Sequence, residues 1–136
     1  HGWYLDLAAG VSGGDGAERV VSEPLLRRST LFFNTIVPDS RSCSDGGTGW
    51  LVSLDFATGL APSDAVFDAN NDGTIDSSDA GYVGQEIVDG LPAQSGILGN
   101  MQYTPTSDGQ LASREVNVGS ANSEGRLGWQ EIAPKN

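Results

Sequence analysis

Residues 29–37 read STLFFNTIV, and residues 48–55 read TGWLVSLD. Both stretches are rich in β-branched and aromatic side chains, which is typical of β-strands. The segment between them, residues 38–47, consists largely of turn formers (PDSRSCSDGG). Pro24 and the pair Arg27 and Arg28 separate residues 18–22 from the first stretch, which predicts a hairpin with its turn in that region.

Further short strands are expected along the chain, with turn signals between them and no sustained 3.6-residue periodicity. Gly81 and Gly84 argue against a long helix in residues 79–88, where one helical turn could fit. The pattern predicts an all-β sandwich or propeller. Trp3, Trp50 and Trp129 are expected in its core. The additional strand candidates are residues 3–7, 97–106, 114–118 and 125–132.

The size and the charge of the chain restrict its function. It has 136 residues and weighs 14.1 kDa, which suits one domain. Seven Lys and Arg oppose 18 Asp and Glu, so the formal net charge is −11. Phosphate backbones and anionic lipids repel such a chain, which argues against nucleic-acid binding. No run of 18 apolar residues occurs, so no membrane insertion is expected.

Catalysis is not expected from this composition. The only histidine is His1, and the only cysteine is Cys43. A Ser-His-Asp or Cys-His device would depend on that one terminal histidine, and a Cys/His zinc site lacks ligands. The sequence opens without an initiator Met or a signal peptide, which suggests a processed fragment or an excised piece.

Residues 68–79 follow the pattern D-x-N-x-D-G-x-I-D-x-x-D, the spacing of an EF-hand calcium loop. Ca²⁺ prefers about six to eight oxygen ligands, and side chains two residues apart converge when the chain curls around the ion. The left-handed conformation available to Gly73 permits the sharp turn. The expected ligands are the side chains of Asp68, Asn70, Asp72 and Asp79, the backbone carbonyl of Thr74, and Asp76 acting through water.

This loop is expected to be a lone structural calcium site. Ile75 is expected to point away from the ion and to anchor the loop in the core. Position twelve is Asp79, which is shorter than the usual bidentate Glu, no second copy is present, and residues 62–67 look like a loop rather than an entering helix. The millimolar calcium of the extracellular space would saturate such a site. The alternative is an Asp/Asn-Gly turn with solvated acids.

A second motif follows the strand at residues 48–55. Asp55, Thr58 and Gly59 form D-x-x-T-G, in which the carboxylate can cap backbone N–H groups and the glycine can supply a left-handed residue. The unit resembles the strand-turn of quinoprotein-type propeller blades. An ordinary hairpin strand is the alternative.

Together the motifs resemble, in order, the C-terminal end of the PilY1/PilC family of type IV pilus adhesins and biogenesis factors. The resemblance covers residues 2–131 and rests on residues 2–7 (GWYLDL), 18–24 (ERVVSEP), 32–38 (FFNTIVP), Cys43, 46–51 (GGTGWL), Leu54 and Asp55, 67–79, 95–97 (SGI) and 125–130 (GRLGWQ).

The resemblance implies that residues 1–136 are a single all-β unit, the terminal blades of a larger modified, quinoprotein-like β-propeller with the calcium loop inserted. It implies a pilus-associated position on the bacterial cell surface and a role in pilus extension and attachment, with calcium as the cofactor. The partners would be the rest of the parent propeller or neighbouring pilus subunits such as minor pilins. Cys43 would pair with an upstream cysteine or remain a free thiol.

Two other function classes fit parts of the sequence. A dockerin-like calcium-dependent docking module would share the pattern of residues 68–79, but dockerins carry two such loops with helices. A quinoprotein dehydrogenase fragment would share the D-x-x-T-G turn, but that enzyme class needs a complete propeller with an axial cofactor site.

Overall fold

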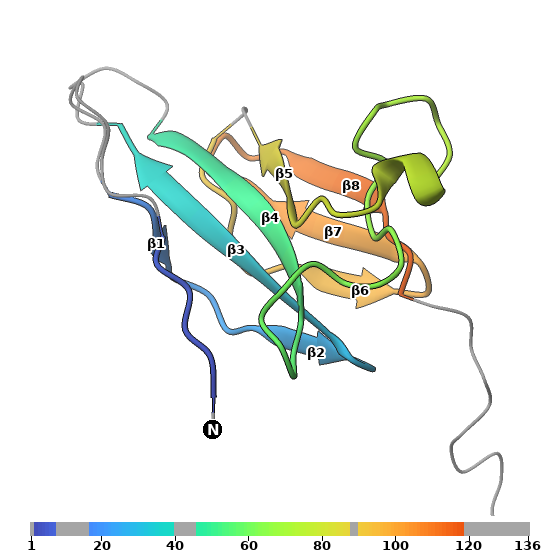
Figure 1. Ribbon diagram of the computed structural model, residues 1–136. Helices are drawn as coiled ribbons and strands as arrows, with labels where there is room; N and C mark the ends of the chain where they lie inside the picture. The colour runs from blue at the N-terminus through green and yellow to red at the C-terminus, as the bar shows by residue number, and fades with distance from the viewer. Residues whose placement is uncertain (1, 8–16, 40–45, 88–89, 119–136) are drawn as a thin grey trace, which may run out of the picture.

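The computed structural model describes residues 2–7, 17–39, 46–87 and 90–118. Within these ranges the chain forms eight β-strands in two antiparallel sheets and one three-residue 3₁₀ turn, Ser77–Asp79 (Figure 1). The all-β prediction is therefore confirmed. Cys43, Trp129 and the strand expected at residues 125–132 lie outside the described residues.

The first sheet is built on the two long strands that the sequence predicts, β3 (Thr30–Pro38) and β4 (Gly47–Asp55). They pair along their whole length, from Thr30 opposite Asp55 to Pro38 opposite Gly47. The other edge of β3 pairs with β1 (Arg19–Val20) and β2 (Leu25–Arg27), and the other edge of β4 pairs with β5 (Gly84–Ile87). The predicted antiparallel pairing of residues 18–22 with the first long strand is present as β1 and β3, but residues 25–27, expected in the turn, form β2, and the chain reverses at Arg28 and Ser29.

The second sheet is a three-stranded meander of β6 (Gly96–Leu98), β7 (Met101–Pro105) and β8 (Leu111–Glu115). The single strand expected at residues 97–106 is thus a hairpin, because Gly99 takes a positive φ of 63° and reverses the chain. The strand expected at residues 114–118 begins earlier, at Leu111, and ends at Glu115.

The two sheets meet across the larger of two apolar clusters, and the smaller one lies on the opposite face of the first sheet. Phe32, Leu51 and Ile87 come from the first sheet, and Ile97 comes from the second. Val116, just after β8, is fully buried in the same cluster. Burial of such side chains stabilises each by about 1.5–3 kcal/mol relative to leaving it exposed. Val66 and Phe67, which lie between β4 and β5, are buried in the same core.

Polar side chains also join the sheets. The Nη2 of Arg27 on β2 donates to the carbonyl of Ile97 on β6 at 3.2 Å, and the Nη2 of Arg114 on β8 donates to the carbonyl of Glu86 on β5 at 3.2 Å. The buried amide of Asn34 donates to the Oγ of Ser95 at 2.9 Å. These contacts satisfy some of the buried polar groups at the sheet junction, whereas the Oε1 of Gln102 and the Nε of Arg114 are buried there without a hydrogen-bond partner among the described residues.

Three local predictions are wrong. Residues 3–7 form no strand; the Nε1 of Trp3 instead donates to the carbonyl of Phe56 at 2.8 Å. Trp3 and Trp50 are not core residues, because each keeps 37% of its surface exposed. The helical turn expected within residues 79–88 lies earlier, at Ser77–Asp79. Residues 84–87 instead form β5, because backbone pairing with β4 holds them extended.

The propeller remains a prediction. The described residues form two open sheets with no closed sheet among them. The helices that a dockerin-like module would place beside its loops are missing from these ranges, since the only helical element is the 3₁₀ turn. That alternative therefore loses its structural basis in the part of the chain that the structure describes.

Candidate functional site: an acidic loop between two sheets

The acidic loop, residues 68–79, lies between β4 and β5 on the side of the molecule where β8 ends (Figure 1). It begins directly after Val66 and Phe67, which are 2% and 1% exposed and belong to the core shared by both sheets. Residues 62–67 contain no helix, as the sequence predicts. The loop therefore starts from a rigid point of the fold.

The first half of the loop curls around its own side chains. Asp68 accepts the N–H of Asp72 on Oδ1 at 3.2 Å and the N–H of Gly73 on Oδ2 at 2.9 Å. The Oδ1 of Asn70 also accepts the N–H of Asp72, at 2.8 Å. Asn71 and Gly73 take positive φ values of 61° and 89°. An added Cβ on Gly73 would meet nothing within 4 Å, so the glycine is required by its conformation rather than by space.

Asp72 is the most connected acid of this half. Its Oδ1 accepts the hydroxyl of Thr74 at 2.6 Å and the N–H of Thr74 at 2.9 Å. The amide Nδ2 of Asn70 donates to its other oxygen at 3.1 Å. The Thr74 hydroxyl first, then the Thr74 N–H and the Asn70 amide, lower the pKa of the Asp72 carboxyl. Asp72 thus stays charged well below neutral pH.

Asp79 closes the loop from its far end. This carboxylate is 1% exposed, and it accepts the N–H groups of Ala69 at 2.8 Å and Asn70 at 3.1 Å on Oδ1 and that of Asp76 at 3.1 Å on Oδ2. The Asp76 N–H is the main cause of its lowered pKa; burial acts in the opposite sense, and the N–H groups of Asn70 and Ala69 also lower it. The position that closes an EF-hand shell is therefore held here by backbone donors.

Asp76 caps the 3₁₀ turn. Its Oδ1 accepts the N–H of Ser78 at 2.7 Å and the Ser78 hydroxyl at 2.8 Å, and together with Asp79 it forms a capping box. Ser78 is a loop residue that the ligand pattern does not predict. Its Oγ also accepts the Nδ2 of Asn70 at 2.8 Å, so it joins the two halves of the loop.

The predicted ligands are thus brought into one compact loop, but not into one ring of carboxylates. Hydrogen bonds connect Asp68, Asn70 and Asp72 directly, whereas Asp76 and Asp79 face backbone donors. In the described part of the chain, no group of three or more His, Cys, Asp or Glu is placed to hold a metal ion. The side-chain oxygens of the loop nevertheless form a donor set without nitrogen or sulfur ligands, which suits a hard cation.

Two side chains outside the loop hold its N-terminal end to both sheets. The Nε2 of Gln85 on β5 donates to the carbonyl of Asp68 at 3.1 Å. Asn117, beyond β8, donates its backbone N–H to Val66 at 2.9 Å and its Nδ2 to Ala65 at 3.1 Å. Sequence reasoning missed both residues, because nothing local to residues 85 or 117 indicates a partner so far away in the chain.

Ile75 does not anchor the loop in the main core. It is half-buried, it is absent from the core cluster, and it lines a hollow of about 450 Å³ together with Val116 and Asn117. The predicted anchor is therefore wrong in detail. Val66 and Phe67 take that role, directly before the first ligand position.

The D-x-x-T-G turn has the geometry that its sequence predicts. The Oδ1 of Asp55 accepts the N–H groups of Ala57 and Thr58 at 3.1 and 2.9 Å and the Thr58 hydroxyl at 2.9 Å. The Thr58 hydroxyl is the main cause of a lowered pKa at Asp55. Gly59 takes a positive φ of 69°. These contacts stabilise a turn and assemble no catalytic set.

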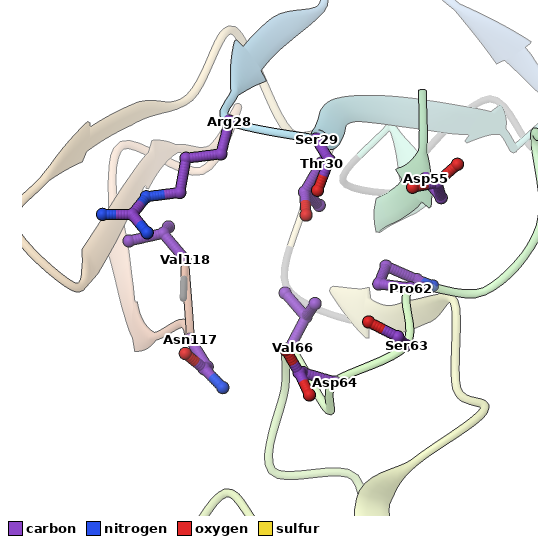
Figure 2. A pocket seen from close by; sticks show the side chains of 10 residues that line it. All are labelled: Arg28, Ser29, Thr30, Asp55, Pro62, Ser63, Asp64, Val66, Asn117 and Val118. Carbon is purple, nitrogen blue, oxygen red and sulfur yellow. The ribbon is translucent and has the colours of Figure 1, made fainter. Parts of the chain in front are cut away.

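A polar hollow of about 220 Å³ is a weaker candidate site. Figure 2 shows Arg28 and Asp55 on opposite sides of it, with Asp64 and Asn117 along its margin. Because this lining combines one guanidinium with two carboxylates, it favours neither an anionic nor a cationic ligand. The acidic loop differs, because its oxygen-bearing side chains share one chemistry.

The chain is similar to curated proteins of the type IV pilus. It is 33% identical to the type IV pilus biogenesis factor PilY1 of Pseudomonas aeruginosa over 141 aligned positions, which cover 99% of this chain and 12% of that protein. One PilY1 homolog of Xylella fastidiosa is 48% identical over 63 positions, 45% of this chain and 4% of the relative. A second is 27% identical over 136 positions, covering 96% and 11%.

The chain therefore spans 12% of the length of the Pseudomonas relatives. No family model matches it, and no solved structure matches it. Among the described residues, no helix is long and apolar enough to cross a membrane.

Proposed function

This chain belongs to the PilY1 family of type IV pilus biogenesis factors, of which it matches a segment, and we propose that it is a calcium-binding all-β unit without catalytic activity. The family resemblance inferred from the motifs is confirmed by these relatives. The observation that carries the calcium proposal is the acidic loop, whose oxygen side chains are gathered in twelve residues and fixed to both sheets by Gln85 and Asn117.

The residues proposed to hold the ion are those of the sequence pattern: Asp68, Asn70, Asp72, Thr74, Asp76 and Asp79. A bound Ca²⁺ would supply positive charge among four carboxylates that otherwise repel one another. Asp68 and Asn70 orient their oxygens by accepting backbone N–H groups, and Gly73 supplies the reversal between the two halves. Ser78 and Gln85 would support the ligands without binding the ion.

Isothermal titration calorimetry tests the site directly. We expect one calcium bound per chain, and loss of that binding in Asp72→Ala. Asp108→Ala is the matched control, because Asp108 also caps a turn through its Oδ1, with Gln110 N–H at 3.1 Å, outside the loop. Equal calcium binding by Asp72→Ala and the unsubstituted chain would contradict the proposal.

The outer faces of both sheets support packing against further sheets, as in propeller blades. On the face of the first sheet opposite the core, the registers place Val20, Leu26 and Trp50, which are 41%, 50% and 37% exposed, beside a buried cluster of Phe33, Val52 and Leu54. On the second sheet, Leu98 and Leu111 are 76% and 60% exposed. Apolar surface on both outer faces is typical of layers that are covered in a larger assembly.

A dye-binding experiment tests this packing. The chain should bind the apolar dye ANS, and a longer segment of a parent polypeptide that includes the neighbouring sheets should bind less dye per molecule. Equal dye binding by the two would contradict a stacked-sheet architecture.

We extend the proposal to the pilus. The relatives are named as pilus biogenesis factors, which supports a position at the bacterial cell surface and a contribution to pilus extension and attachment. The partners would be the rest of a parent propeller or neighbouring pilus subunits such as minor pilins. Introducing Asp72→Ala into a full-length parent protein should reduce surface piliation and attachment, and Asp108→Ala should not. Unchanged piliation and attachment despite lost calcium binding would separate the pilus role from the calcium site.

A further inference from the structure

The polar hollow of about 220 Å³ lies where the turn between β2 and β3 meets the end of β4 (Figure 2). Residues 62–66, which follow β4, form another of its sides. Two of these lining residues are apolar: Pro62, and Val66, which is 2% exposed and belongs to the core shared by both sheets. The hollow therefore combines an apolar floor with polar walls.

Several polar groups of these walls have unused hydrogen-bonding capacity. Thr30 on β3 is 9% exposed, and Figure 2 shows its side chain pointing into the hollow. Within the described ranges, no group hydrogen-bonds to the side chains of Thr30, Ser63 or Asp64. The three donors that bind the Asp55 carboxylate all bind its Oδ1, which leaves Oδ2 for another partner. Polar groups that are largely buried without partners gain from a ligand that supplies them.

The charges on the walls favour a ligand without ionised groups. A charged ligand would meet the guanidinium of Arg28 and the carboxylates of Asp55 and Asp64 together. A zwitterion could face both signs, but Arg28 and Asp64 are exposed, and exposed ion pairs contribute little to binding. Hydroxyl groups both donate and accept hydrogen bonds. A neutral ligand with several hydroxyl groups can therefore donate to the carboxylates and exchange hydrogen bonds with Thr30 and Ser63.

We propose that this hollow binds one ring of a neutral sugar, with Thr30, Asp55 and Asp64 as its hydrogen-bonding residues. A sugar ring carries hydroxyl groups around its rim and C–H groups on its faces. The C–H groups would pack on Pro62 and Val66, and the hydroxyl groups would meet the polar walls. The volume lies below the about 300–1,000 Å³ of typical ligand pockets, which restricts the site to a single ring.

The first sheet holds two of these residues in fixed positions. Thr30 and Asp55 are directly opposite each other in the register of β3 and β4. The N–H of Phe56 donates to the carbonyl of Ser29 at 2.8 Å, which continues this pairing beyond the strands. Side chains that are already placed lose little conformational freedom when a ligand binds. The site is therefore preorganised on rigid elements.

An NMR titration of the 136-residue chain with D-glucose, D-galactose and D-mannose tests the proposal, in calcium-free buffer so that the acidic loop does not contribute. At least one sugar should shift the amide signals of Ser29, Thr30, Ser63 and Asp64 in a saturable way. Glycerol and glycine are the comparison solutes. No saturable shift with any of the three sugars would overturn the proposal. Equal binding of glycerol, or tighter binding of glycine, would also overturn it, because neither has a sugar ring.

Two variants locate the binding in this hollow. Asp64→Ala should weaken it by at least about tenfold, because hydrogen bonds to charged groups are the stronger ones. Glu86→Ala, which removes an exposed carboxylate of β5 outside the hollow, is the matched control and should bind as the unsubstituted chain does. Thr30→Val should weaken binding by roughly threefold to tenfold without lowering the thermal midpoint, since no described group bonds to that hydroxyl. Unchanged affinity in both Asp64→Ala and Thr30→Val would overturn the proposal.

Discussion

The buried carboxylate of Asp79 accepts the backbone N–H of Asn70 at 3.1 Å, nine residues earlier in the chain. With Ala69 at 2.8 Å on the same oxygen, this contact joins the end of the acidic loop to its beginning. The loop thus has a defined shape built from its own side chains. A cation site would draw on a preformed arrangement rather than on a disordered acidic stretch.

Replacing Asp79 should destabilise the protein. Asp79→Ala leaves three backbone N–H groups without their acceptor, and we expect the thermal midpoint to fall by about 5–10 °C. Asp79→Asn keeps one acceptor oxygen and should lose less. Circular dichroism melts check the order. A midpoint unchanged in Asp79→Ala would show that the carboxylate does not hold the loop together.

The stability should fall in acid. Hydrogen bonds lower the pKa values of Asp55, Asp72, Asp79 and Asp108 in the folded state. A carboxyl with a lowered folded pKa stabilises the fold above its unfolded pKa, which is about 3.9, and this stabilisation is lost as the pH falls through the folded value. Chemical denaturation should therefore give a flat free energy of unfolding from pH 7 to about pH 5 and a decline below about pH 4.

A matched variant refines the acid prediction. Asp55→Asn removes one of the four carboxyls, so its decline below pH 4 should be shallower than that of the unsubstituted chain. Parallel curves for the two proteins would mean that this carboxyl contributes nothing to the acid dependence.

Gly49 should be sensitive to a single methyl group. A Cβ at this position would overlap the carbonyl oxygen of Thr35 on β3 and the ring of Pro92, so β3 or the segment around Pro92 must shift. We expect Gly49→Ala to lower the free energy of unfolding by about 2 kcal/mol or more. Gly96→Ala is the control, because a Cβ on this strand glycine would meet nothing within 4 Å. Equal stabilities in urea titrations would contradict the close approach.

Gly59 tests the docking of the N-terminal segment. A Cβ there would overlap the indole of Trp3, and the φ of 69° adds backbone strain. Gly109→Ala is the control for backbone strain, because Gly109 has a φ of 85° and a Cβ there would meet nothing within 4 Å. This variant should lose only the cost of the left-handed conformation, about 1–2 kcal/mol of unfolding free energy. Gly59→Ala should in addition change the fluorescence of Trp3, measured against Trp3→Phe. An unchanged spectrum would show that Trp3 does not rest on this turn.

The long strands and the turns could be predicted from the sequence because their signals are local. STLFFNTIV and TGWLVSLD carry strand-forming residues along their length, and Asp55 and Gly59 mark their own turn. Residues 3–7 show the same local signal without a pairing strand: the Trp3 indole bonds to Phe56 instead. β5 was missed because its extended form comes from pairing with β4 rather than from its composition.

In the candidate site, too, the contacts between neighbouring residues could be predicted and the long-range contacts could not. The loop pattern predicted the reversal at Gly73 and the clustering of Asp68, Asn70 and Asp72, since these depend on neighbouring residues. The contacts from Gln85 and Asn117 depend on how the two sheets meet, and no periodicity in the sequence encodes that meeting. Ile75 illustrates the limit: its aliphatic character suggested the core, whereas the structure leaves it half-buried at the edge of a hollow.

The thermal midpoint of the chain in calcium, measured by calorimetry with magnesium as the comparison, tests the central claim most directly. A ligand that binds only the folded state stabilises it by about 2.7 kcal/mol at a hundredfold excess over its Kd. The account predicts a midpoint that rises with calcium in the unsubstituted chain and a much smaller rise in Asp72→Ala and Asp76→Ala. A full calcium response in either variant, or none in the unsubstituted chain, would contradict it.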